Sequence, residues 1–596
     1  MRWSVLGVVS LLQMDPKVGD LSGNSLRIQG LLEQARSAGG QVAVSTELAI
    51  CGYPPRDLLL ESDFVKSAME AALTLPTALP ALIGTPLPPD EPRQRPANGV
   101  VRVGSSSGTI TGHAEGHVVG KKQLLPTYDV FDEARYFEPS NRTGLARSCG
   151  GLTLGVTICE DAWQSAGKTP SSYQQDPIEH IAEWGRQGVE IHATVNLSAS
   201  PFHTQKFQTR LEVARHVAAV LQHPFLLANQ VGGNDDLLFD GRSLAVWPSG
   251  RAVVAPAWQE GVLMVDLDKP ENCQWMASTQ TNALCKGEGT LVHLEPSEDG
   301  SQLDGSTDDL AYAVITGLSD YCRKSGINGI VLGLSGGIDS AVAACVAVHA
   351  VGAENVSGLA MPSRFSSQHS IDDAAHTAHA LGLSYAVHPI GGMHDAVEHE
   401  LASVLAKGHA VAGENVQARL RGLTVMAYSN ALGRMAVTTG NKSEIAQGYC
   451  TLYGDMAGGY APLADVYKME VYALAEWFNA RASARGATPP VNESTLTKPP
   501  SAELAPNQQD DDTLPPYDVL DNMLRAHIED GHDAHGMVAL GFDEAAVLDV
   551  LQRLERNEHK RWQMPPGPRV SSRAFGQGWR RPLASHHQWR TQEEHR

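Results

Sequence analysis

One stretch, residues 329–348, constrains the fold more than any other part of the 596-residue chain. It reads GIVLGLSGGIDSAVAACVAV. Residues 330–334 are apolar or glycine, which is typical of a strand in a parallel sheet covered on both faces. A turn at 335–337 follows, and an alanine- and valine-rich helix is predicted from Ser340. Unpaired backbone N–H groups and the dipole at the start of such a helix attract anions, so we expect a phosphate group to bind here.

The glycine turn is not a Walker loop, because no Gly-Lys-Ser/Thr closes it and no lysine is set against a γ-phosphate. The word Ser-Gly-Gly-Ile-Asp-Ser, residues 335–340, instead resembles the pyrophosphate loop of ATP enzymes that cleave between the α- and β-phosphates. Those enzymes activate a carboxylate or carbonyl as an adenylate. The alternative, a glycine turn that binds nothing, is disfavoured by the strand and helix on either side.

Length and charge limit the classes of protein to consider. A chain of 596 residues exceeds one ordinary core, so at least two domains are expected. The formal net charge of −21 argues against a general surface for nucleic acid or anionic membrane. Eight cysteines without C-x-x-C spacing fit a reducing compartment. We therefore expect a cytoplasmic enzyme with no nucleic-acid and no membrane partner.

Changes in pattern along the chain predict the domain limits. Short apolar runs alternate with helical segments over 1–285, which predicts a layered α/β domain. The acidic, Ser- and Gly-containing segment within 286–309 has no apolar period and is interpreted as a linker. Strands and helices then alternate again, so 310–596 is predicted to form a second domain with an open parallel sheet.

Three chemically reactive residues each follow a predicted strand of the first half: Glu47, Lys122 and Cys159. A cysteine nucleophile needs a base to take its proton and a cation to hold developing negative charge on oxygen. A carboxylate and an ammonium group can fill these roles. Taken singly, each residue has an ordinary alternative, namely an ion-pair partner, a solvated charge and a small buried side chain.

The longer words around these residues resemble the nitrilase, or carbon–nitrogen hydrolase, family. They read ELAICGYPPRDLL from Glu47, KQLLPTYDVFDE from Lys122 and GVTICEDAW from Gly155. The resemblance implies an α-β-β-α sandwich in which Cys159 attacks an amide carbonyl, Glu47 is the general base and Lys122 stabilises the oxyanion. One departure is Thr46, which stands where the family usually has proline.

The glutaminases of that family hold their substrate with a tyrosine, a serine and a lysine in matching words. The resemblance implies that Tyr128, Ser200 and Lys206 bind glutamine in this chain. A lysine suits the α-carboxylate of glutamine and hydroxyl groups suit its polar ends.

Four polar sequence motifs follow the glycine turn in the second half of the chain. They are MPS from Met361, ENVQARLR from Glu414, TTGNKSEIA from Thr438 and GYCTLYGDMAGG from Gly448. Such words between apolar segments indicate loops at the carboxyl edge of a sheet, where ligands bind. Each alone is also compatible with an ordinary turn. Together they resemble the glutamine-dependent NAD synthetase family, and the resemblance runs from the first strand to the ArgAlaPheGly word at 573–576.

That resemblance implies a Rossmann-like ATP pyrophosphatase domain in the second half, with ATP and Mg²⁺ as cofactors. The implied ATP-binding residues are Gly333, Leu334, Ser335, Gly336, Gly337, Ile338, Asp339, Ser340, Thr439 and Lys468. Deamido-NAD is expected to contact Asn415, Glu444 and Lys560. The carboxylates of Asp339 and Glu444 match magnesium-holding positions, and their hard oxygens suit that ion.

The implied reaction is the ATP-dependent amidation of deamido-NAD to NAD through an acyl-adenylate, with ammonia taken from glutamine. Its other products are AMP, pyrophosphate and glutamate. The expected partners are the small molecules glutamine, ATP and deamido-NAD, and further copies of the chain in a homo-oligomer. The family also implies sheltered passage of ammonia and low glutaminase activity without the synthetase ligands.

Two other functions stay open on the sequence. The first is an enzyme that also hydrolyses glutamine and uses ATP for activation but amidates another carbonyl acceptor, such as a different nucleotide or a tRNA base. The negative charge of the chain disfavours tRNA. The second is a nucleotide-binding sensor without catalysis. The pairs His113 with His117 and His586 with His587 suggest a metal site, but no third ligand is near in sequence, so solvated histidines are expected.

Overall fold

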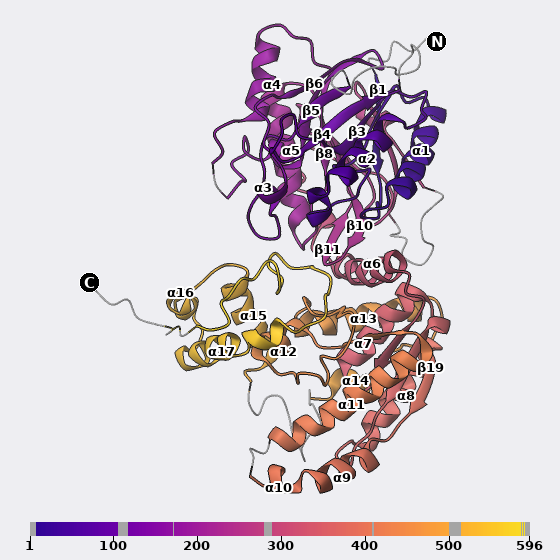
Figure 1. Cartoon of the computed structure of the whole chain (residues 1–596), viewed down its shortest axis with the longest axis vertical. Coiled ribbons are helices and arrows are strands. Elements are labelled where there is room, and N and C mark those ends of the chain that lie inside the picture. The colour runs from indigo at the N-terminus through magenta and orange to yellow at the C-terminus, as the bar shows by residue number, and fades with distance from the viewer. Residues whose placement is uncertain are drawn as a thin grey trace, which may run out of the picture. The chain divides into compact units, whose positions relative to one another are not determined.

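The computed structural model describes residues 7–104, 117–170, 172–278, 289–407, 411–499, 514–585, 587 and 589. The chain divides into two compact units, Met1–Gly305 and Ser306–Arg596, which are described separately below (Figure 1). Among the described residues, no helix has both the length and the apolar character that crossing a membrane requires.

Two seven-stranded sheets form the centre of the described part of the first unit. In spatial order, the first contains β15 (Gln274–Ala277), β14 (Gly261–Asp266), β1 (Val8–Gln13), β2 (Val42–Val44), β3 (Ala81–Leu87), β4 (Ala97–Val103) and β5 (Val118–Lys121). The second contains β16 (Val292–Leu294), β13 (Ala252–Val254), β12 (Leu244–Val246), β9 (Phe225–Asn229), β8 (Ala193–Ser198), β7 (Leu152–Ile158) and β6 (Gly144–Cys149). A hairpin of β10 (Val231–Asn234) and β11 (Leu237–Asp240) forms a separate two-stranded sheet.

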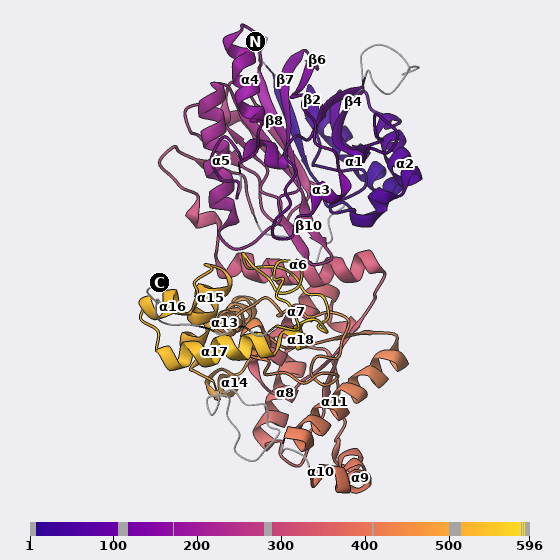
Figure 2. The same ribbon diagram turned by 60° about the vertical axis from the view of Figure 1, so that its left-hand side comes forward.

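The two sheets face each other, and helices cover their outer faces. Apolar side chains of both sheets, such as Val44 and Val156, share one buried cluster between them. Helices α1 (Leu21–Ser37) and α2 (Ser62–Leu73) pack on the first sheet, and α4 (Pro177–Arg186) and α5 (Lys206–Leu221) on the second (Figure 2). Burial on both faces explains why β7 reads as a near-continuous apolar run. The predicted α-β-β-α sandwich is confirmed.

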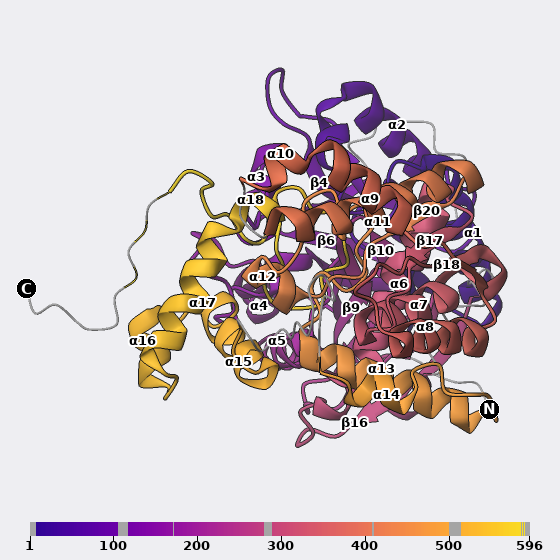
Figure 3. The ribbon, with the colours of Figure 1, turned by 90° about the horizontal axis from the view of Figure 1, so that it is seen from below.

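The second unit contains a four-stranded parallel sheet of described residues in the order β19 (Ser384–Val387), β18 (Val356–Ala360), β17 (Ile330–Gly333) and β20 (Met435–Val437). Helix α11 (Val411–Leu432) lies on one side of it, where Val425 shares an apolar cluster with Val331. Helices α6 (Thr307–Ser325) and α7 (Ile338–Val351) lie on the other side (Figure 3). The predicted α/β domain with a parallel sheet is confirmed.

The remaining helices complete this unit. They are α8 (Gln368–Leu381), α9 (Gly391–Glu400), α10 (Ala402–Leu405), α12 (Lys442–Gln447), α13 (Lys468–Ala484), α14 (Glu493–Thr497), α15 (Tyr517–Ile528), α16 (Ala534–Ala539), α17 (Glu544–Arg556) and α18 (Glu558–Arg561). Four of them, α12, α15, α16 and α17, enclose a separate apolar cluster that includes Leu520 and Leu551.

Two local features differ from the sequence analysis. Helix α7 begins at Ile338, two residues before the predicted start, with Gly337 as its N-cap. The interval 286–309 interpreted as a linker contains the strand β16, just before its acidic part, and this strand pairs with β13 of the first unit. The boundary between the compact units falls after Gly305.

Candidate functional site

Glu47 and Lys122 meet inside the first unit. Lys122 follows β5, and its ammonium nitrogen Nζ lies 2.8 Å from Glu47 Oε1. Neither side chain is exposed beyond 1%. Glu47 also accepts hydrogen bonds from Asn98 Nδ2 at 2.7 Å and from the backbone N–H of Ala199 at 3.1 Å. Both carboxylate oxygens of Glu47 are therefore fixed by donors.

A second carboxylate, Glu133 at the start of α3 (Glu133–Tyr136), contacts the same ammonium group. Glu133 Oε1 accepts from Lys122 Nζ at 2.8 Å and from Tyr53 Oη at 3.0 Å. Burial lowers the pKa of Lys122, but the carboxylates of Glu133 and Glu47 outweigh it and hold the pKa well above its usual value. Lys122 is therefore a permanent cation between two acids.

Cys159 lies at the sharp turn between β7 and the short helix Cys159–Ala162. The backbone of Cys159 has a φ of 46°, which is a left-handed conformation. Residues other than glycine rarely adopt it, and those that do are often found at functional sites. The thiol is buried, with 6% of the residue exposed. Burial and the charge of Glu47 raise the pKa of Cys159 above its usual value, and Lys122 opposes them. The charges of Glu47 and Lys122 thus act directly on this cysteine.

Asp161 joins the cysteine turn to the lysine segment. Its Oδ2 accepts from the backbone N–H of Ile158 at 3.0 Å. Its Oδ1 accepts from the N–H groups of Gln123 at 3.0 Å and Leu124 at 2.9 Å, directly after Lys122. One buried carboxylate therefore fixes the position of both segments.

The predicted glutamine-binding residues divide into two groups. Tyr128 Oη donates to Glu160 Oε1 at 2.9 Å. Burial raises the pKa of Glu160, while the Tyr128 hydrogen bond and the charge of Lys206 act against this, so Tyr128 and Lys206 both act on this carboxylate. Ser200 lies instead beside Arg210, whose Nη2 donates to Ser200 Oγ at 3.5 Å.

A cavity of about 280 Å³ lies over the glycine turn in the second unit. Of the predicted residues, those that line it are Gly333, Leu334, Ser335, Gly337, Ile338, Asp339, Ser340, Thr439, Glu444 and Lys468. Gly336 has a φ of +78°, and a Cβ there would lie 2.2 Å from the backbone oxygen of Ser370, so only glycine fits this position. The turn is thus packed tightly against the start of α8.

Lys468 brings two acidic side chains together at the wall of this cavity. Its Nζ lies 2.5 Å from Asp339 Oδ2 and 3.1 Å from Glu444 Oε1. Burial lowers the pKa of Lys468, but these carboxylates outweigh it and hold the pKa above its usual value. Asn441 Nδ2 donates to Asp339 Oδ1 at 2.7 Å and so holds this carboxylate from its other side.

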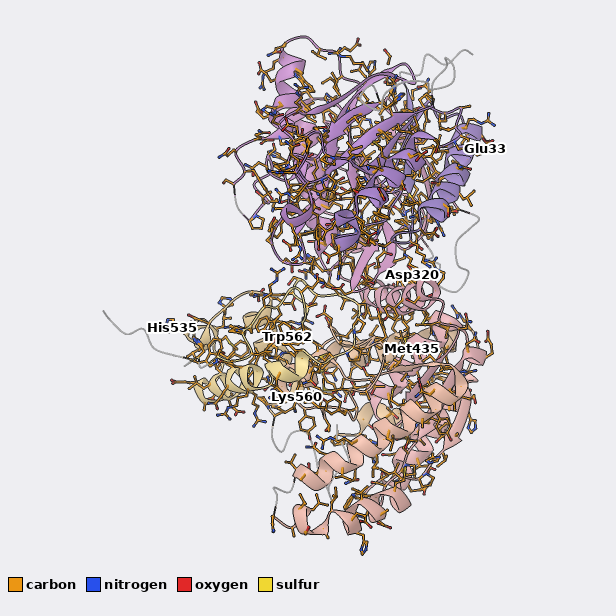
Figure 4. All side chains as sticks on the ribbon, in the orientation of Figure 1. Glu33, Asp320, Met435, His535, Lys560 and Trp562 are labelled. Carbon is orange, nitrogen blue, oxygen red and sulfur yellow. The ribbon has the colours of Figure 1, made fainter. Side chains whose placement is uncertain are left out.

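Three predicted residues are not among those that line the cavity in the described structure: Gly336, which packs against Ser370 instead, Asn415 and Lys560. Lys560, labelled in Figure 4, donates from Nζ to the carbonyl oxygens of Gly448 at 2.6 Å and Cys450 at 2.8 Å. Asn415 Oδ1 accepts from Thr451 Oγ1 at 3.1 Å, and Thr451 does line the cavity. Lys560 and Asn415 therefore both contact the loop 448–451 that forms part of the wall.

Comparisons with known proteins agree on both halves. The carbon-nitrogen hydrolase model matches residues 8–276, and the NAD synthase model matches residues 310–565. The glutamine-dependent NAD(+) synthetases of Synechocystis sp. and Thermotoga maritima are 39% and 38% identical, each over 97% of this chain and 98% of the relative. The chain belongs to the glutamine-dependent NAD(+) synthetase family.

A solved member of that family has the same fold over nearly the whole chain. The synthetase of Acinetobacter baumannii, solved with adenosine diphosphate, is 30% identical, covers 97% of this chain and 98% of its own, and has a TM-score of 0.68.

Sequence reasoning gave no role to three acids that the structure places beside the family's predicted reactive groups. They are Glu133, Glu160 and Asp161. Each lies within a sequence motif that matches the nitrilase family. The motif KQLLPTYDVFDE ends with Glu133, and GVTICEDAW contains Glu160 and Asp161. Their proximity to Lys122 and Tyr128 depends on how the chain folds, and no spacing rule predicts it.

The histidine pairs show no metal site where the structure describes them. His113 and His586 lie outside the described residues. Over the described ranges, no group of three or more His, Cys, Asp or Glu side chains is arranged to hold a metal ion.

Proposed function

We propose that this chain makes NAD from deamido-NAD, ATP and glutamine. The observation that carries the proposal is the presence, in one chain of this family, of a buried cysteine, carboxylate and lysine site and of a glycine-turn cavity. The first site fits hydrolysis of an amide, and the second fits activation by ATP. ATP-dependent amidation with glutamine as nitrogen donor follows from family membership.

In the first unit, Cys159 Sγ attacks the amide carbon of glutamine. Because its raised pKa keeps the thiol protonated at neutral pH, a base must take the proton during attack. Glu47 accepts this proton and passes it to the leaving ammonia. Lys122 stabilises the oxyanion, since two buried carboxylates hold its ammonium group and its charge acts on Cys159. Water then hydrolyses the thioester, with Glu47 again as base, and glutamate leaves.

Glu133 gives Lys122 its fixed charge and orientation. With Glu47 alone, proton transfer to the carboxylate would leave the ammonium group without a negative partner. While Glu47 carries the proton, Glu133 is the carboxylate that remains within 2.8 Å of Lys122 Nζ, and it is ionised above the pKa of about 7 to which burial raises it. Tyr128, Lys206 and Ser200 are proposed to hold the glutamine, with Glu160 as acceptor for its α-ammonium group.

In the second unit, an oxygen of the nicotinate carboxylate attacks the α-phosphorus of ATP and pyrophosphate leaves. The backbone N–H groups at the N-terminus of α7 hold the phosphate oxygens, while those of Ser335 and Gly337 donate to Ser340 Oγ and Ser335 Oγ. Ammonia then attacks the acyl carbon of the adenylate, and AMP leaves. The residues proposed to bind ATP are those of the turn together with Thr439 and Lys468. Asn415, Glu444 and Lys560 are proposed to bind deamido-NAD, the last through the loop that it holds.

The residues around Lys468 also fit a magnesium ion. Asp339 and Glu444 converge on one point of the cavity wall, as their distances to Lys468 Nζ show. Mg²⁺ prefers oxygen ligands and commonly takes one or two carboxylates together with phosphate oxygens and water. When bound, it would neutralise charge on the departing pyrophosphate.

We further propose a cytoplasmic homo-oligomer whose first catalytic domain spans residues 1–285 and whose second spans 310–596, with 286–309 between them. The two family matches, at 8–276 and 310–565, lie within these limits.

Isotope tracing tests the proposal. The enzyme is incubated with ATP, deamido-NAD and glutamine labelled with ¹⁵N in its amide group. We expect labelled nitrogen in the carboxamide of NAD and one AMP and one pyrophosphate per NAD formed. If deamido-NAD is not consumed while another nucleotide or a tRNA is amidated, the acceptor is different. If no AMP forms with any acceptor, the chain is not a synthetase.

A further inference from the structure

A second lysine lines the cavity over the glycine turn, from a segment that the reaction described above does not use. Three cationic side chains, Arg421, Lys468 and Lys498, line the described part of the cavity. The ammonium group of Lys468 is held by two carboxylates, so that group of three charges is net negative. Arg421 Nε donates to the backbone oxygen of Met361 at 3.2 Å. Lys498 comes from the end of α14.

The position of Lys498 follows from a short chain of contacts. Its Nζ donates to Ser370 Oγ at 2.8 Å. Ser370 is the residue whose backbone packs against Gly336 of the glycine turn. The neighbouring Thr495 is buried and also lines the cavity. The ammonium group of Lys498 therefore lies in the cavity lining beside the segment of α8 that packs against the glycine turn.

Asp373 on α8 fixes the segment that carries this lysine. Its Oδ1 accepts from Asn492 Nδ2 at 2.8 Å and from Ser494 Oγ. Asn492 caps α14, and the carbonyl oxygen of Ser494 accepts from the backbone N–H of Lys498 at 2.9 Å. Asp373 is 4% exposed, and its Oδ2 has no hydrogen bond within the part of the chain that the structure describes. A buried oxygen without a donor is costly, and orienting α14 gives a reason for keeping the carboxylate there.

We infer that Lys498 binds the β- and γ-phosphates of ATP and that Asp373 is a positioning residue that holds Lys498 over the glycine turn. This inference rests on the proposed function and adds to it. The glycine turn has no Walker lysine within its own sequence, and Lys498 supplies the corresponding charge from α14. The cation stabilises ATP in its ground state and the pyrophosphate as it leaves.

Steady-state synthesis of NAD with ammonium chloride as nitrogen source tests the role of Lys498, because this assay does not depend on Cys159. In Lys498→Met the side chain keeps its length and loses its charge. We expect kcat/KM for ATP to fall about ten- to a hundredfold, the worth of one or two charge-assisted hydrogen bonds. KM for deamido-NAD should stay within about twofold, and Lys498→Arg should restore most of the loss. The matched control is Lys407→Met, which removes an exposed lysine after α10.

A double-mutant cycle tests the role of Asp373. We expect Asp373→Ala to lower kcat/KM for ATP about tenfold, and Asp373→Asn, which keeps Oδ1 as acceptor, to retain most of the activity. In the Lys498→Met background, Asp373→Ala should add less than about twofold, since both changes remove the same contact. A merely structural role would give additive losses. If Asp373→Ala unfolds, Ser494→Ala removes one of the same hydrogen bonds and takes its place in the cycle.

Three results would overturn the inference. They are a Lys498→Met enzyme equal to Lys407→Met, a loss confined to deamido-NAD, and additive losses in the cycle. Wild-type enzyme that makes NAD from ammonia, ATP and deamido-NAD in the same assay keeps the proposed function intact in each case. Wild-type enzyme that makes none contradicts the proposed function itself.

Discussion

The substitution Asp161→Asn tests whether one carboxylate aligns the cysteine turn with the lysine segment. In the wild type, three backbone N–H groups donate to Asp161, at 2.9 to 3.0 Å. An asparagine can keep the bonds from Gln123 and Leu124 at Oδ1. Its Nδ2 then faces the N–H of Ile158, donor against donor. The N–H of Ile158 is left buried without an acceptor, and the turn that carries Cys159 loses its fixed end.

The expected loss of stability follows from these contacts. A hydrogen bond to a charged acceptor contributes about 1.5–3 kcal/mol, and a buried unsatisfied N–H costs about 1–3 kcal/mol. Together they give about 2.5–6 kcal/mol for the first unit. At about 2 cal/mol/K per residue, a unit of about 300 residues unfolds about 4–10 °C lower. Because a displacement of about 1 Å in a catalytic group can cost about a hundredfold, we expect glutamine hydrolysis to fall by about that factor.

The assay compares glutamine-driven and ammonia-driven NAD synthesis at pH 8, since burial raises the pKa of Asp161 to about 7. Ammonia-driven synthesis should stay within about twofold of the wild type. The matched control is Asp176→Asn, in which the same change affects a helix cap where asparagine is equally suited. Glutamine hydrolysis within about threefold of the wild type, or an unchanged unfolding temperature, would refute the reasoning.

Three further predictions concern charge in the two sites. Burial raises the pKa of Glu133 to about 7. Between about pH 4.5 and 7 the folded state therefore binds more protons than the unfolded state. The free energy of unfolding then falls as the pH rises through this range. Glu133→Gln should make that slope shallower in urea titrations, and an unchanged slope would show that Glu133 does not titrate there. Lys468→Met leaves the carboxylates of Asp339 and Glu444 without their cation. We expect the free energy of unfolding of the second unit to fall by about 3–5 kcal/mol. Ammonia-driven synthesis should fall at least about a hundredfold, and near-normal synthesis would contradict this. Chelation of Mg²⁺ should stop pyrophosphate release from ATP and deamido-NAD while the basal rate of ammonia release from glutamine stays the same, and continued pyrophosphate release would exclude a role for the metal.

Local patterns predicted the scaffold well, because they act over few residues. The pattern of residues 329–348 predicted both β17 and α7. Only the start of the helix differs, since Gly337, and not a residue with a capping side chain, is its N-cap. The strand β16 was not predicted because its three residues, directly before the acidic segment, are too few to show a period, and only pairing with β13 makes them a strand.

The site residues could be predicted where they belong to sequence motifs of a known family. Glu47 and Lys122 lie 75 positions apart, and their 2.8 Å contact becomes visible only in the folded chain. The same holds for Glu133 beside Lys122 and for Asp373 beside Ser494, which are brought together by the packing of separate elements. Lys560 shows the opposite case, since the resemblance assigned it to deamido-NAD, but in the structure its ammonium group contacts backbone oxygens of the cavity wall.

The central claim is that nitrogen released at Cys159 in the first unit is consumed by an adenylate in the second. The most direct test is NAD synthesis by Cys159→Ala with glutamine and with ammonium chloride as alternative nitrogen sources. We predict that glutamine-driven synthesis is lost to below about 1% of the wild type, because no other nucleophile replaces the thiol, and that ammonia-driven synthesis stays within about twofold. Glutamine-driven synthesis that survives the substitution, or the loss of both activities in a folded protein, would contradict the account.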